Sequence, residues 1–201
     1  MHIPSSATKD IDIGLFYPAL EASLRPSDNY NVERWLYVPN TYSEYRYILG
    51  TRGVRPLVCI GINPSTAEPD NLDPTLKSAE RIAHHNGYDS FLMFNVYAQR
   101  ATNPDDMERE YNAWLQQENA KAFSYLLDLC GERPSIWAAW GNLIEKRPYL
   151  TSCVADLIRI AAERDAVWYH AGAISAHGHP HHPLYLKKDS ALEPFDVTRY
   201  L

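Results

Sequence analysis

Four short apolar runs, separated by stretches of helical spacing, constrain the fold of this chain more than any other feature. The runs cover residues 57–62, 91–97, 136–140 and 166–170. Apolar residues recur at three- and four-residue steps between the runs, over residues 74–86, 107–130 and 147–163. Strands that alternate with helices favour a parallel sheet covered on both faces. The runs show little alternation, as expected of strands buried on both faces.

Residues 1–34 differ from the remainder, because Pro and Ser are scattered through them and no helical or strand period persists. We predict that they form an N-terminal extension packed on the body, and that residues 35–201 form a single α/β domain. Aromatic residues recur between residues 35 and 49, which indicates one or two antiparallel strands. The length of 201 residues and the hydrophobic share of 45% suit one domain with an appendage.

Composition argues against several classes of protein. No apolar run approaches the roughly 20 residues of a membrane-spanning helix, so we expect no membrane partner. Asp10 and Asp12 stand where a signal peptide needs basic and then apolar residues, so we expect a cytoplasmic protein. The formal net charge of −6 disfavours non-specific nucleic-acid binding, which needs a basic surface. Cys59 and Cys153 lie in apolar segments, which predicts buried free thiols.

Polar residues follow the predicted strands at the point where each apolar run stops. The first run ends at Gly61 and passes into a turn at Asn63, Pro64 and Ser65. The second run contains Asn95 and is followed by Arg100, and the third run is followed by Asn142. Because ligands of open α/β sheets bind at the carboxyl ends of the strands, we predict a ligand-binding rim there.

The tripeptide Asp73-Pro74-Thr75 has a structural explanation of its own. Asp is a favoured N-cap residue and Pro a favoured first helical residue, so the tripeptide predicts the start of a helix. Asp70 and Asp73 also lie in the loop after Asn63, so both could face the same rim.

Four of the eight histidines fall between residues 177 and 182. Three interpretations remain open for this segment. It could bind a transition metal, since imidazole is a common ligand, although it contains no Cys or Glu. It could be a Pro-restrained loop that directs one His at a substrate. It could also be a surface loop whose histidines have no role, and we assign no metal ligand.

Several ordered motifs together resemble a widespread bacterial and phage domain family of unknown function. The resemblance covers roughly residues 45–187, and its motifs are Gly61–Ser65, Asp73–Thr75, Asn95–Pro104, Trp140-Gly141 and His182–Tyr185.

The chain also distantly resembles the uracil-DNA glycosylase superfamily. Gly61-Ile62-Asn63-Pro64 is similar to the motif that follows the first strand in that superfamily, and His182-Pro183 is similar to its second motif. The resemblance implies a three-layer α/β/α sandwich with a short, mainly parallel four-stranded sheet. An N-terminal antiparallel extension would be added to it here.

This second resemblance implies roles for particular residues. Asn63 would orient an attacking water and His182 would stabilise the departing base. Because an amide is a poor general base, a carboxylate such as Asp70 or Asp73 would have to assist, and we assign Asp73 a catalytic role. Cleavage of an N-glycosidic bond passes through an oxocarbenium-like state, which such groups suit. Together with the polar rim, the resemblance predicts these substrate-binding residues: Gly61, Ile62, Pro64, Ser65, Asp70, Asn95, Arg100, Asn142, His181, Pro183 and Tyr185. No cofactor is implied.

The leading hypothesis is therefore a glycosylase-like protein that binds a nucleobase, a nucleotide or nucleic acid and hydrolyses an N-glycosidic bond. The first alternative is a non-catalytic nucleotide- or protein-binding module on the same fold. The second is a metal-dependent hydrolase that uses the His-rich segment.

Overall fold

A single seven-stranded sheet forms the centre of the protein in the computed structural model, which describes residues 1–201. The strands are β1 (Trp35–Val38), β2 (Ile48–Thr51), β3 (Pro56–Gly61), β4 (Ser90–Asn95), β5 (Ser135–Ala138), β6 (Val167–Ala171) and β7 (Leu192–Pro194). Their order in the sheet is β1-β2-β4-β3-β5-β6-β7. The four predicted apolar runs form β3, β4, β5 and β6, which pair in parallel.

The expected four-stranded sheet is wrong in its number of strands. β1 and β2 pair antiparallel with each other, and β2 joins the edge of β4, also antiparallel. β7, which no sequence pattern indicated, pairs antiparallel with β6. The predicted N-terminal antiparallel strands therefore belong to the main sheet. Gly50 makes this pairing possible, because the backbones of β2 and β4 approach closely there.

Four α-helices accompany the sheet: α1 (Phe16–Ser23), α2 (Pro74–His85), α3 (Ala113–Leu129) and α4 (Pro148–Ala162). The last three fall within the three predicted helical stretches. However, α3 begins at Ala113 and not near residue 107, because the Asn112 side chain caps it by accepting hydrogen bonds from the Trp114 and Leu115 N–H groups. None of the helices is long and apolar enough to cross a membrane.

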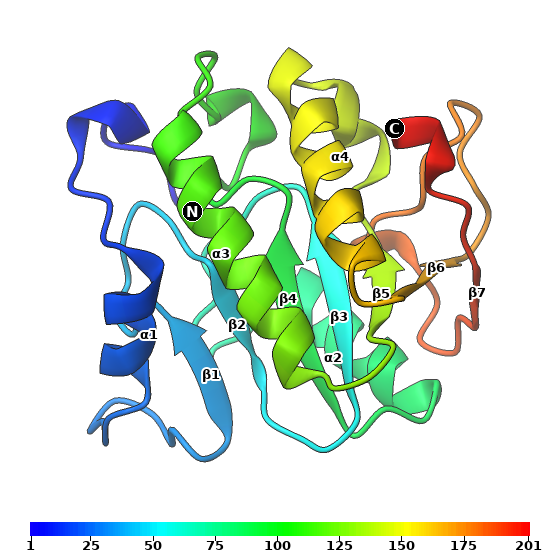
Figure 1. Ribbon diagram of the computed structural model, residues 1–201, viewed down its shortest axis with the longest axis horizontal. Helices are drawn as coiled ribbons and strands as arrows, with labels where there is room; N and C mark the ends of the chain where they lie inside the picture. Colours follow the sequence, from blue (N-terminus) through cyan, green and yellow to red (C-terminus); the bar gives the residue numbers. More distant parts are fainter.

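The helices lie on both faces of the sheet (Figure 1). Leu57 and Cys59 of β3 pack in one apolar cluster with residues of α2. Val58 and Ile60, which point to the opposite face, pack in a larger cluster with residues of α1, α3 and α4. Phe16 of α1 is fully buried in the larger cluster, so residues of the N-terminal segment share the main core. Cys59 and Cys153 are buried free thiols, as predicted.

The start of α2 confirms the interpretation of the Asp73-Pro74 pair. Asp73 Oδ1 accepts a hydrogen bond from Leu76 N at 2.9 Å, and Pro74 is the first helical residue. Gly87, with φ of +81°, follows the last turn and provides the left-handed conformation that ends many helices.

The connections of the parallel strands place a crevice at their carboxyl ends. The chain leaves β3 toward α2 on one face of the sheet and leaves β4 toward α3 on the opposite face (Figure 1). In open α/β sheets, ligands bind where neighbouring connections diverge in this way. The loops after β3, β4 and β5 therefore surround the expected ligand-binding position.

Candidate functional site

A cavity of about 740 Å³ opens at the carboxyl ends of β3, β4 and β5, and we call it the rim cavity. Segments that follow these three strands line it, together with the start of α2 and part of the segment between residues 175 and 185. Leu184 and Tyr185 at its lining are 44% and 78% exposed, whereas Arg46 and Asn95 are each only 1% exposed. The cavity thus extends from an open mouth to a buried inner wall.

The structure brings most of the predicted site residues to the rim cavity. The three residues with predicted catalytic roles, Asn63, Asp73 and His182, all line it although they come from three separate segments. The predicted binding residues that line it are Gly61, Ile62, Ser65, Asn95, Asn142, His181 and Tyr185. Four others do not line it: Pro64, Asp70, Arg100 and Pro183.

Contacts elsewhere explain why two of these residues lie outside the cavity. Asp70 Oδ1 accepts a hydrogen bond from Trp35 Nε1 at 3.0 Å and lies 3.6 Å from Arg34 Nη1. The carbonyl oxygen of Pro183, which is buried, accepts a hydrogen bond from Ser78 Oγ at 2.8 Å.

Arg100 is fully buried outside the cavity lining, where it ties the loop after β3 to neighbouring strands. Its Nη1 donates to the carbonyls of Ser65 and Ala67, and its Nη2 donates to Tyr37 Oη at 3.1 Å. The guanidinium also lies over the ring of Tyr42, 4.2 Å from its centroid. These contacts give Arg100 a structural position and not a ligand-facing one.

Asn63 has one side-chain group available to a ligand. Its Nδ2 donates to the carbonyl of Ala101 at 2.8 Å and to the carbonyl of Pro64 at 3.1 Å. Both amide hydrogens are therefore used within the protein, and Oδ1 is left as a hydrogen-bond acceptor. An acceptor held in this way suits a water molecule or a ligand N–H group.

His182 offers a ligand a hydrogen-bond donor, whereas Asn63 offers an acceptor. Its Nδ1 accepts a long hydrogen bond of 3.4 Å from Leu184 N, so the neutral ring carries its proton on Nε2. Burial lowers the pKa of His182, and the nearby carboxylate of Asp73 only partly opposes that effect. The neutral ring can thus donate a hydrogen bond from Nε2 without adding a charge.

Asp73 is the only carboxylate that lines the rim cavity. One of its oxygens caps α2, and the other makes no hydrogen bond within the protein. The site therefore combines an acceptor amide, a neutral imidazole donor and one carboxylate, which are the groups needed to hold a water and stabilise a leaving group.

The histidines of the 177–182 segment diverge into two pairs. His177 Nδ1 and His179 Nε2 each lie 3.1 Å from a Glu145 carboxylate oxygen, while His181 and His182 line the rim cavity. No group of three His, Cys, Asp or Glu side chains is arranged to hold a metal ion.

Arg46 and Tyr200 are among the residues of this region that sequence reasoning did not assign to the site. Arg46 lies in the rim-cavity lining, and its only signal was a charge placed between Tyr45 and Tyr47 in an aromatic segment. Tyr200, near the end of the chain, accepts a hydrogen bond from Trp140 Nε1 at 3.1 Å and contacts His179 Nδ1 at 2.7 Å. No local pattern could have indicated that second contact.

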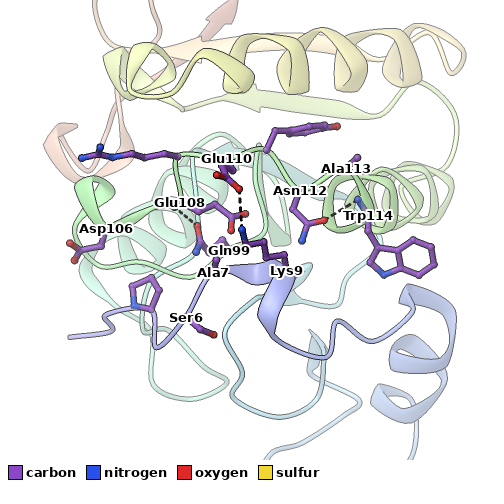
Figure 2. A pocket seen from close by; sticks show the side chains of 13 residues that line it. Ser6, Ala7, Lys9, Gln99, Asp106, Glu108, Glu110, Asn112, Ala113 and Trp114 are labelled. Carbon is purple, nitrogen blue, oxygen red and sulfur yellow. Dashed lines mark hydrogen bonds and ion pairs between the residues drawn. The ribbon is translucent and has the colours of Figure 1, made fainter.

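A second cavity, of about 640 Å³, lies between the N-terminal segment and the loop before α3 (Figure 2). Some of its polar groups are paired with one another. Lys9 Nζ lies 3.2 Å from Glu110 Oε2, and Gln99 Oε1 accepts from the Glu108 N–H at 2.9 Å (Figure 2). None of the predicted site residues lines it, so the rim cavity is the candidate site.

A family model described as "Protein of unknown function (DUF1643)" matches residues 46–184. The chain belongs to this family. The match confirms the resemblance to a domain family of unknown function, with bounds close to those predicted. No match was found among curated proteins or among solved structures. Because the DUF1643 description states no activity, the chemistry of the rim cavity has to indicate the function.

Proposed function

We propose that the rim cavity binds a nucleobase-containing ligand and that water bound at Asn63 hydrolyses an N-glycosidic bond there. The proposal includes a fold of the uracil-DNA glycosylase type, with one helical layer on each face of the sheet. The observation that carries it is the presence of Asn63, Asp73 and His182 in one cavity, since these three residues come from separate segments.

The proposed reaction uses each of the three groups once. A water molecule donates one hydrogen to Asn63 Oδ1, and its oxygen forms a bond with the anomeric carbon of the sugar. The other hydrogen of the water passes as a proton to the free oxygen of Asp73. The bond between that carbon and the base nitrogen breaks, the electron pair leaves with the base, and His182 Nε2–H stabilises the charge on the base.

The test is release of free base from nucleosides, nucleotides and oligonucleotides, including single strands that contain uracil or hypoxanthine. Asp73→Asn is the sharpest variant, because asparagine keeps the helix cap but cannot accept the proton. We expect it to retain the stability of the protein and to lose about 100-fold or more in rate, the lower end of the usual range for acid–base catalysis.

Asn63→Ala and His182→Asn should also lower the rate. Asn29→Ala is the matched control, because Asn29 is exposed and does not line the rim cavity, and it should leave the rate unchanged. Absence of base release from every substrate would refute the hydrolytic part of the proposal.

A non-catalytic nucleotide-binding module is the second candidate. The capping role of Asp73 favours it, because one oxygen of the only carboxylate is already used by the α2 N-terminus. Saturable binding of a nucleotide, measured by calorimetry, without base release would select this candidate over the enzyme.

A further inference from the structure

The inner wall of the rim cavity holds a buried positive charge that forms no salt bridge. Arg46 and Arg100 are 1% and 0% exposed, and neither forms a salt bridge. Both guanidiniums donate to the same carbonyl oxygen, that of Ala67, so they lie side by side. Buried charges are normally paired, so this arrangement needs an explanation.

The two arginines differ in how well the protein satisfies them. Arg100 has several partners and does not line the cavity. Arg46 lines it, and its contacts are weaker: Nη1 donates to Ala67 O at 3.2 Å and Nη2 to Asn95 Oδ1 at 3.4 Å. Burial, with a contribution from Arg100, lowers the pKa of Arg46 to about 9, and the carboxylate of Asp73 only partly opposes that effect. A bound anion would remove this penalty.

Asn95 adds a second unsatisfied donor to the same wall. Its Oδ1 accepts from Arg46, whereas its Nδ2 is buried and has no hydrogen-bond partner. Arg46 Nε is likewise buried without a partner. Arg46 and Asn95 therefore offer N–H donors and no free acceptor, which suits an anionic group with several oxygens better than the mixed donor and acceptor edge of a base.

The start of α2 also lines the cavity through Pro74, Thr75 and Leu76. The positive end of its dipole is already met by the Asp73 carboxylate, which caps the helix and lines the same cavity. The attraction for an anion therefore comes from the buried donors of Arg46 and Asn95.

We infer that Arg46 and Asn95 form a phosphoryl-binding subsite at the inner wall, and that the ligand of the rim cavity is a nucleoside 5′-monophosphate. This inference rests on the proposed function. With the phosphoryl group at Arg46, the base extends toward the mouth, where Tyr185 is 78% exposed and available for stacking. The sugar then lies between them, in the part of the cavity lined by Asn63 and His182.

The test is calorimetric titration of the full chain with the four common ribonucleosides, their 5′-monophosphates and inorganic phosphate. At least one monophosphate should bind about tenfold or more tightly than its nucleoside, as expected for charge-assisted hydrogen bonds. Arg46→Gln should abolish that preference and Arg46→Lys should reduce it. Arg159→Gln, which removes the same charge from an exposed position on α4, should leave it unchanged.

Asn95→Asp keeps the test valid if Arg46→Gln does not fold. The new carboxylate gives Arg46 an internal counter-ion, so the variant should fold with a melting temperature at or above that of the unaltered protein. It should nevertheless lose the preference for the monophosphate, because it repels a second anion. Retention of the preference in a folded Asn95→Asp variant would show that the two side chains serve structure alone.

The outcomes separate the subsite from the proposed function. Equal binding of nucleoside and monophosphate overturns the subsite and leaves nucleobase binding intact. Phosphate binding that depends on Arg46, with no nucleoside contribution to affinity, supports the subsite and overturns the nucleobase proposal. No binding of any of these probes overturns both.

Discussion

Tyr200→Phe tests whether the last residues of the chain hold the His-rich segment in place. The Tyr200 hydroxyl accepts from Trp140 Nε1 at 3.1 Å, and its own hydrogen can be donated to His179 Nδ1 at 2.7 Å. His179 Nε2–H then faces Glu145 Oε1 at 3.1 Å. Tyr200, Trp140 and His179 are all buried, so water cannot replace the hydroxyl.

The magnitude follows from the groups that the substitution leaves without partners. Phenylalanine fills nearly the same volume, so no large cavity forms. The Trp140 N–H becomes a buried donor with no acceptor, and His179 Nδ1 loses its partner. An unsatisfied buried group costs about 1–3 kcal/mol, so the free energy of unfolding should fall by about 2–4 kcal/mol. For a chain of 201 residues, each kcal/mol lowers the melting temperature by about 2–4 °C.

Urea denaturation followed by tryptophan fluorescence measures this loss, with thermal melting as an independent reading. Tyr185→Phe is the matched control, because that side chain is 78% exposed and its hydroxyl makes no hydrogen bond within the protein. The control should change stability by no more than about 0.5 kcal/mol. An equally small effect of Tyr200→Phe would refute the argument that the buried network stabilises the segment.

Three further predictions concern the sheet, the imidazole and the helix cap. In Gly50→Ala the new Cβ would lie 2.1 Å from the Phe91 carbonyl oxygen, so β2 must separate from β4 and stability should fall by about 3 kcal/mol or more in urea denaturation. The pKa of His182 is lowered in the folded protein, so the unfolded chain binds more protons just below pH 6.5. Stability should therefore decrease as the pH is lowered through that range. His182→Gln should flatten that slope, and an unchanged slope would contradict it. Asp73→Ala should lower stability by about 1 kcal/mol and Asp73→Asn by much less; equal losses would argue against the cap.

The elements that sequence predicted well depend on local chemistry. The apolar runs that form β3 to β6 are short and nearly continuous, and the start of α2 is specified by a cap and a proline in consecutive positions. The start of α3 was predicted too early. Apolar spacing continues through Met107 and Tyr111, yet the helix begins only where Asn112 provides the cap, and Glu108 accepts hydrogen bonds from the Thr8 backbone and side chain of the N-terminal segment.

The sequence likewise could not show which of the polar residues at the rim face the cavity. Asp70 and Asp73 follow the same strand, and sequence placed both at the rim. Asp73 faces the cavity because it starts α2, whereas Asp70 is held by Trp35 from another strand. Arg46 was not assigned to the site, because its burial beside Asn95 depends on β2 joining β4.

By itself the sequence determined the alternation of strands and helices, the cap of α2 and the polar residues at the strand ends, because these depend on neighbours a few residues away. Only the tertiary structure decided which polar residues share a cavity and which charge is buried without a salt bridge. Those properties depend on contacts between segments far apart in the chain, such as Arg46 with Asn95 and Tyr200 with His179.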